Sequence, residues 1–102
     1  MTNEQFLAHI DAAFQRRKSL LEVKRKSYSG DKDRLEQFHR AGAVQNILPT
    51  EALMGMAAKH FTSLTDMCKD PNNSTMKQWH ERLDDLRNYF DLLDALVTDV
   101  KE

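Results

Sequence analysis

The 102-residue sequence has little cysteine, proline or glycine, with one, two and three residues respectively. A single cysteine cannot form a disulfide framework and suits a reducing compartment. Cys68 follows Leu64 at helical spacing, which predicts a small buried thiol. Few glycines, prolines and β-branched residues argue against extended sheet, so the composition favours helices.

Long apolar runs are also absent, and no stretch approaches the about 20 residues of a membrane span. The first residues, MTNEQFLAHID, lack the basic start and apolar segment of a signal peptide. A net charge of -1 predicts no general affinity for nucleic acid or membranes. We therefore expect a cytoplasmic protein.

The near-neutral total hides two charged segments of opposite sign. Basic side chains gather between Arg16 and Lys26, and acidic ones between Glu81 and Asp99. Such runs usually form solvated helix faces. If the chain folds back on itself, the basic segment could face a phosphate and the acidic segment could face a metal ion.

Apolar spacing and turn residues predict a first helix over residues 3–27 and a short one over 32–41. Thr2 and Gln5 have the spacing of a capping box, and Gly42 is expected to end the short helix. The stripe of the first helix contains Leu7, Phe14, Leu21 and Tyr28, with Ile10, Arg17 and Lys24 beside it.

The same reasoning predicts a third helix from Thr50, as its cap, to Lys69, a loop over 70–74 and a final helix over 76–100. The expected fold is one all-α domain over residues 1–102, a small bundle of three main helices and one short helix. The apolar stripe of the last helix contains Met76, Trp79, Leu83, Leu86, Phe90, Leu93, Val97 and Val100.

The third helix places two polar residues in its most apolar part. His60 shares a predicted stripe with Leu53 and Ala57, so it is either a hydrogen-bonded core residue or a ligand contact. Lys59 lies on the neighbouring stripe and either reaches the surface or meets an anion, because lysine is rarely buried without a partner.

The last helix carries oxygen-bearing side chains at i, i+4 and i+7, which are Glu81, Asp85 and Asn88. Side chains so spaced can share Mg²⁺, which commonly takes one or two carboxylates together with waters and substrate phosphates. Ordinary solvation of a helix face is the alternative.

Three segments, LLEVKRKSYSGD, ALMGMAAKHFTSLTDM and ERLDDLRNYFDLLDALV, in this order resemble a small helical family common in bacteriophages, the nucleotide-modification-associated or MazG-like proteins. The resemblance covers about residues 14–98. It implies an all-α fold related to nucleoside triphosphate pyrophosphatases, assembled as dimers or tetramers and acting in the bacterial host cytoplasm. The family's polar positions, which would line a site for a phosphorylated nucleotide, match Lys24, Tyr28, Lys59, His60, Asp85 and Asn88.

Within this resemblance, Lys24 and Lys59 would meet phosphate, and Asp85 a metal or a partner cation. Active pyrophosphatases of this kind carry a Glu-Glu-x-x-Glu cluster that holds Mg²⁺, and Lys59 and His60 stand on the corresponding helix here. Because pyrophosphate hydrolysis needs metal to neutralise charge and activate water, the incomplete carboxylate set leaves enzymatic activity open while anion binding is still expected.

Three functions are consistent with these patterns. The first is a phage-type protein that holds a phosphorylated nucleotide in a cationic pocket between helices without hydrolysing it, including a cyclic or modified nucleotide signal used by host defence. The second is a Mg²⁺-dependent nucleoside triphosphate pyrophosphohydrolase that holds its metal on Glu81, Asp84 or Asp85. The third is a helical oligomeric interaction protein without a small-molecule ligand.

Overall fold

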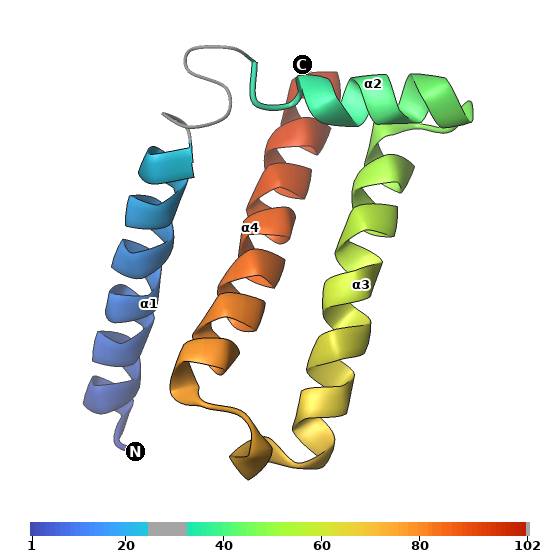
Figure 1. Cartoon of the computed structure of the whole chain (residues 1–102). Helices are drawn as coiled ribbons and strands as arrows, with labels where there is room; N and C mark the ends of the chain where they lie inside the picture. The colour runs from blue at the N-terminus through green and yellow to red at the C-terminus, as the bar shows by residue number, and fades with distance from the viewer. Residues whose placement is uncertain (25–32, 102) are drawn as a thin grey trace. The chain divides into compact units, whose positions relative to one another are not determined.

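The computed structural model describes residues 1–24 and 33–101, without the side chains of Lys24 and Val100 (Figure 1). All regular elements in these ranges are helical, which confirms the all-α class. The chain divides into two compact units, Met1–Arg34 and Leu35–Glu102. The elements are α1 (Asn3–Lys24), α2 (Glu36–Gln45), α3 (Pro49–Lys69), the 3₁₀ turn η2 (Pro71–Asn73) and α4 (Met76–Lys101).

The unit Met1–Arg34 contains α1, whose start is the predicted capping box. The Gln5 N–H donates to Thr2 Oγ1 at 3.1 Å and the Thr2 N–H donates to Gln5 Oε1 at 2.7 Å, which satisfies two backbone donors that the helix leaves unpaired. Leu7 and Phe14 of the predicted stripe are exposed. The predicted end of this helix, at residue 27, lies outside the described residues.

The predicted bounds of the short helix were wrong, because α2 begins at Glu36 and continues past Gly42 to Gln45. Asn46 ends it with φ 57°, the left-handed conformation that asparagine tolerates well. Gly42 instead lets the backbone of residues 47–49 pack closely against α2. A Cβ at that position would lie 2.8 Å from the carbonyl oxygen of Ile47, so the chain after α2 can fold back only over a residue without a side chain.

The cap of α3 was also predicted wrongly. Leu48 is the capping position and Thr50 already lies inside the helix. Pro49 occupies the first turn, where its missing N–H costs nothing. The Glu51 carboxylate accepts a hydrogen bond from the Leu48 N–H at 3.0 Å, so the helix start is stabilised by the glutamate at the third position and not by a hydroxyl at the cap.

The start of α4 is a capping box that the sequence analysis did not identify. The Gln78 N–H donates to Thr75 Oγ1 at 3.1 Å and the Thr75 N–H donates to Gln78 Oε1 at 2.8 Å. In the first turn of α4, the indole N–H of Trp79 donates to the carbonyl oxygen of Pro71 at 3.0 Å. These bonds fix the predicted loop over 70–74, part of which forms η2.

Within the unit Leu35–Glu102, α3 and α4 lie side by side and antiparallel, and α2 crosses the end at which α4 finishes (Figure 1). Each helix contributes one side chain to the centre of the core, namely Phe38, Leu53 and Leu96, all almost fully buried. Partly buried side chains packed against this centre are Leu35, Met56, Tyr89, Leu92 and Leu93.

The predicted buried stripe of α4 was only partly right. Leu86 is buried and Leu93 packs on the core, whereas Met76, Phe90 and Val97 are exposed. The core instead takes Leu96, a position outside the predicted stripe. Apolar residues occur on two neighbouring faces of α4, and the contacts with α2 and α3 select one of them.

Cys68 is exposed, so the predicted buried thiol was wrong. On α3 the half-buried neighbours are Leu64 and Met67, and the turn from Met67 to Cys68 carries the thiol about 100° away from that face. No helix in the described part of the chain is long and apolar enough to cross a bilayer.

Candidate functional site

Polar side chains of α3 and α4 come together around His60. The His60 ring is half-buried on the same face of α3 as Leu53 and Ala57, as predicted. The rings of His60 and Tyr89 have centroids 5.1 Å apart at an angle of 45°. His60 Nδ1 also lies 3.8 Å from Asp85 Oδ2. This distance is too long for a hydrogen bond.

Asn88 lies three residues after Asp85 on α4 and is 7% exposed. Its Oδ1 is buried, and so is His60 Nδ1; neither atom has a hydrogen-bond partner within the described ranges. A buried polar atom without a partner costs about 1–3 kcal/mol. His60 Nδ1 lies close to the Asp85 carboxylate and Asn88 follows Asp85 by one helical turn, so the two atoms mark this place as a candidate site. We refer to His60, Asp85 and Asn88 as the polar cluster.

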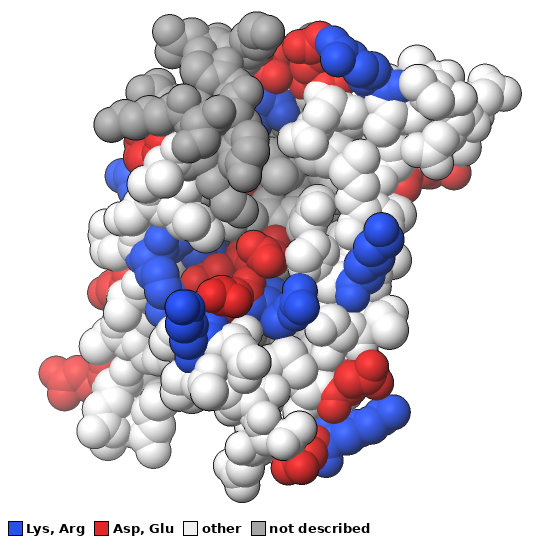
Figure 2. Space-filling view, viewed as in Figure 1, with Lys and Arg blue, Asp and Glu red and all other residues white. Residues whose placement is uncertain are grey.

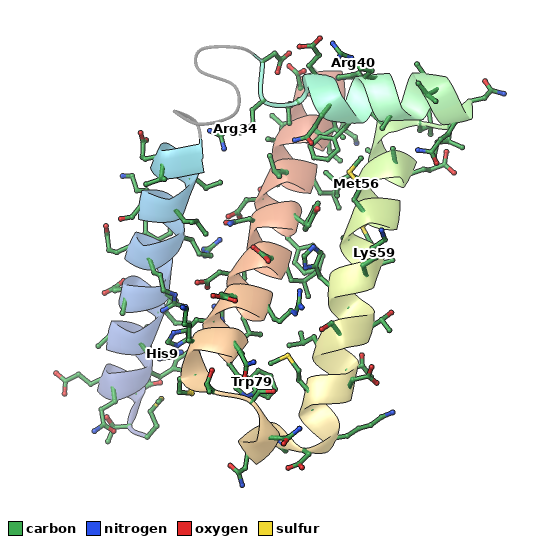
Figure 3. All side chains as sticks on the ribbon, viewed as in Figure 1. His9, Arg34, Arg40, Met56, Lys59 and Trp79 are labelled. Carbon is green, nitrogen blue, oxygen red and sulfur yellow. The ribbon has the colours of Figure 1, made fainter. Side chains whose placement is uncertain are left out.

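Lys59 is exposed and extends along α3 on the side away from α4 (Figure 3). Neighbouring helical residues point about 100° apart, so Lys59 and His60 do not face the same point although they are adjacent in sequence. Figure 2 shows acidic side chains over the middle of α4 with a basic side chain next to them, and a separate basic side chain over α3. Lys59 therefore lies outside the polar cluster.

Two of the predicted phosphate-binding residues are not placed. Lys24 is the last residue of α1, and its side chain lies outside the described residues, as does the whole of Tyr28. Lys24 and Lys59 also belong to different units of the chain. The convergence of their two amines stays a prediction.

The predicted metal ligands Glu81 and Asp85 lie four residues apart on α4, Glu81 exposed and Asp85 half-buried. Among residues 1–24 and 33–101, no three His, Cys, Asp or Glu side chains form a group that could hold a metal ion. Mg²⁺ is commonly held by only one or two protein carboxylates when waters and substrate phosphates supply its other ligands. Glu81 and Asp85 would be enough in that case. The Mg²⁺ prediction thus depends on a phosphorylated ligand being present.

Tyr89 was not among the predicted site residues, and Asp84 was named only as an alternative metal ligand. Tyr89 contacts the His60 ring, and the signal for it was its position four residues after Asp85, on the same helix face. Asp84 is buried and pairs with Arg87, with 3.3 Å between Asp84 Oδ1 and Arg87 Nη1. No periodicity predicts a buried carboxylate, because helix faces rich in charge are normally solvated.

The arrangement suits recognition more than covalent chemistry. Asp85 and Asn88 Oδ1 accept hydrogen bonds, and the imidazole of His60 can donate or accept. The unpaired acceptor Asn88 Oδ1 suits a ligand that carries an N–H or O–H donor. Comparisons of this chain with protein-family models, curated proteins and solved structures found no match.

Proposed function

We propose that this protein holds a phosphorylated nucleotide without hydrolysing it, with the polar cluster as the centre of its site. The observation that carries the proposal is a pair of buried atoms without hydrogen-bond partners among the described residues, His60 Nδ1 and Asn88 Oδ1, on two residues that neighbour Asp85. The resemblance to nucleotide-modification-associated proteins, in which these three positions are polar, supports the same ligand class.

The nucleoside part of the ligand fits the polar cluster better than the phosphate does. Ribose hydroxyls and the amino or imino groups of a base are donors, and Asp85 and Asn88 Oδ1 are acceptors. A phosphate carries acceptor oxygens and negative charge, which the Asp85 carboxylate would repel. The ring of Tyr89, 5.1 Å from His60, adds an aromatic surface on which a base can stack.

Lys59 is the positively charged predicted site residue whose side chain the structure describes, and its exposed amine can reach outward toward phosphate. A strongly hydrated ammonium on a flexible stem contributes chiefly through its charge. The proposed ligand is therefore held at two ends, with its nucleoside in the polar cluster and its phosphate toward Lys59.

Binding without hydrolysis is favoured over the pyrophosphohydrolase. Hydrolysis would need metal-held water beside the phosphates, and the carboxylates of the glutamate cluster in active pyrophosphatases are replaced here by Lys59 and His60. The protein would then sequester its ligand, including a cyclic or modified signalling nucleotide.

The direct test is native mass spectrometry of the protein purified from its host, followed by heat denaturation and analysis of the released molecule. Recovery of an intact nucleotide supports the proposal. Incubation with a panel of nucleotides and Mg²⁺ gives the other outcome, because pyrophosphate release that is lost in Asp85→Ala would establish the pyrophosphohydrolase instead.

A matched pair of variants assigns the site. Asp85→Asn removes the charged acceptor of the cluster and should weaken nucleotide binding by about 1.5–3 kcal/mol, or roughly tenfold to a hundredfold in Kd, measured by calorimetry. Asp99→Asn makes the same change at an exposed position of α4 and should leave Kd unchanged. Equal Kd values for both variants would place the ligand elsewhere.

A further inference from the structure

Among the described residues, the half-buried Asp85 carboxylate has no permanent cation beside it. Its side chain is 30% exposed, and its ion-pair partner in the same part of the chain is His60, which carries a charge only when it is protonated. Removing a carboxylate from water is costly unless hydrogen bonds or an opposite charge replace the lost water. A ligand that brings N–H donors to both oxygens of Asp85 would supply that replacement.

His60 supplies a hydrogen-bonding group of the opposite kind next to this carboxylate. In one of its two neutral tautomers, and when it is protonated, the imidazole donates from Nδ1. His60 Nδ1 lies 3.8 Å from Asp85 Oδ2 and is buried without a hydrogen-bond partner within the described ranges. The site therefore presents one donor followed by the two acceptor oxygens of a carboxylate.

The edges of the nucleobases differ in the order of their donors and acceptors. Guanine presents the acceptor O6, the donor N1–H and the donor N2–H in a row, which complements one donor followed by two acceptors. Adenine and cytosine each carry an acceptor ring nitrogen beside their amino group, and that nitrogen would face a carboxylate oxygen. Uracil and thymine carry one imino donor between two carbonyl oxygens, so one carboxylate oxygen would face an acceptor.

We propose that the nucleotide held by the polar cluster carries guanine, and that Asp85 is the residue that selects this base. Asp85 accepts the N1–H and the N2–H of guanine through its two oxygens, and the Nδ1–H of His60 donates to O6. A carboxylate that accepts two parallel N–H bonds makes a charge-assisted contact, which is stronger and more specific in geometry than a contact between neutral groups. This inference rests on the proposed nucleotide binding and specifies the base.

Two neighbours of Asp85 on α4 support a bound base. Asn88 is 7% exposed, and its buried Oδ1 has no hydrogen-bond partner among the described residues. This acceptor, one turn from Asp85, is left for the second N2 hydrogen or for a ribose hydroxyl. The Tyr89 ring, 5.1 Å from that of His60, offers a surface on which a planar base stacks. A ribose diol also brings two donors to a carboxylate, but it has no planar surface for Tyr89.

The first test compares bases on the unchanged protein by calorimetry with nucleoside 5′-monophosphates. Inosine monophosphate lacks only the N2 amino group of guanosine monophosphate (GMP) and should bind about tenfold to a hundredfold more weakly, because one hydrogen bond to a charged acceptor is lost. Adenosine monophosphate should bind at least about a hundredfold more weakly than GMP, since it leaves the polar groups of the site unpaired. 2′-Deoxyguanosine monophosphate should bind like GMP, because the base and not the ribose faces Asp85.

The second test reverses the selection. In Asp85→Asn the amide keeps one acceptor for N1–H and presents a donor in place of the second acceptor. Xanthine has a carbonyl oxygen where guanine has its N2 amino group, so xanthosine monophosphate should bind this variant at least about tenfold tighter than GMP does. The wild-type protein should show the opposite preference. The control Asp99→Asn removes the same charge at an exposed position of α4 and should keep the preference for GMP.

The outcomes separate the choice of base from nucleotide binding itself. Equal Kd values for the guanosine, inosine and adenosine monophosphates would overturn the guanine assignment and leave the nucleotide proposal standing. An Asp85→Asn variant that is folded by circular dichroism and still prefers GMP to xanthosine monophosphate would also overturn it, because a purely structural aspartate gives no reversal. If no 5′-monophosphate or 5′-triphosphate of these nucleosides binds at millimolar concentration, the nucleotide proposal fails as well.

Discussion

Gly42 and Gly55 differ in what surrounds them, and this difference predicts opposite effects of the same substitution. Gly42→Ala would put a Cβ 2.8 Å from a backbone carbonyl oxygen. The backbone after α2 would have to shift, so we expect a loss of about 1–3 kcal/mol in the free energy of unfolding. Denaturant titration of the variant measures this loss.

Gly55→Ala is the matched control, since among the described residues nothing beyond the adjoining backbone of α3 itself lies within 4 Å of a Cβ at that position. Gly55 lies inside α3, where alanine is favoured over glycine by about 0.5–1 kcal/mol. We therefore expect Gly55→Ala to raise the free energy of unfolding. If Gly42→Ala also stabilised the protein, the close approach described for Gly42 would be wrong.

Asn88 offers a way to separate a binding role from a structural one. Because its Oδ1 is buried without a partner, Asn88→Leu should leave stability unchanged or raise it by up to about 2 kcal/mol, while nucleotide binding is lost. Thermal unfolding and calorimetric binding measure the two effects. A structural asparagine would show the reverse, with a loss of stability and unchanged binding.

At the scale of single elements, the capping box of α4 should contribute measurably to stability. Thr75→Ala removes the Oγ1 that accepts the Gln78 N–H at 3.1 Å, and we expect a loss of about 1 kcal/mol in the free energy of unfolding. Thr65→Ala is the control, because its hydroxyl only donates to the carbonyl oxygen of Phe61 within α3, and removing that bond should change stability little. Equal losses in the two variants would contradict the capping role.

The selection of one apolar face of α4 gives a second prediction at this scale. Leu96 is fully buried and Val97 is 38% exposed, although they are adjacent. At concentrations where the chain is monomeric, Leu96→Ala should cost about 2–5 kcal/mol and Val97→Ala less than about 1 kcal/mol. A larger loss of stability for Val97→Ala than for Leu96→Ala would show that the predicted stripe of α4 is buried in the core.

For the whole molecule, the division into two units predicts unequal protection of backbone amides. The largest fully buried side chains, Phe38, Leu53 and Leu96, all belong to the unit Leu35–Glu102. Amides in the middle of α3 and α4 should therefore exchange with deuterium only through global unfolding, whereas those of α1 should exchange earlier. Hydrogen exchange followed by mass spectrometry tests this, and equal protection of α1 and α3 would indicate one cooperative unit.

The sequence by itself determined the helical class, the positions of the three long helices and the side of α3 that carries His60. These features depend on local propensity and on spacing within one helix, which the chain specifies residue by residue. It also placed Asp85 and Asn88 together, because residues three apart on a helix are neighbours whatever surrounds them.

Only the tertiary structure decided the end of α2 and the buried face of α4. Gly42 looks like a helix end in sequence, and its real role appears only when residues 47–49 fold back over it. The two apolar faces of α4 are equivalent in an isolated helix, and packing against Leu53 and Phe38 distinguishes them. Contacts between distant segments carry this information, because burial depends on which surfaces meet and not on the order of residues along the chain.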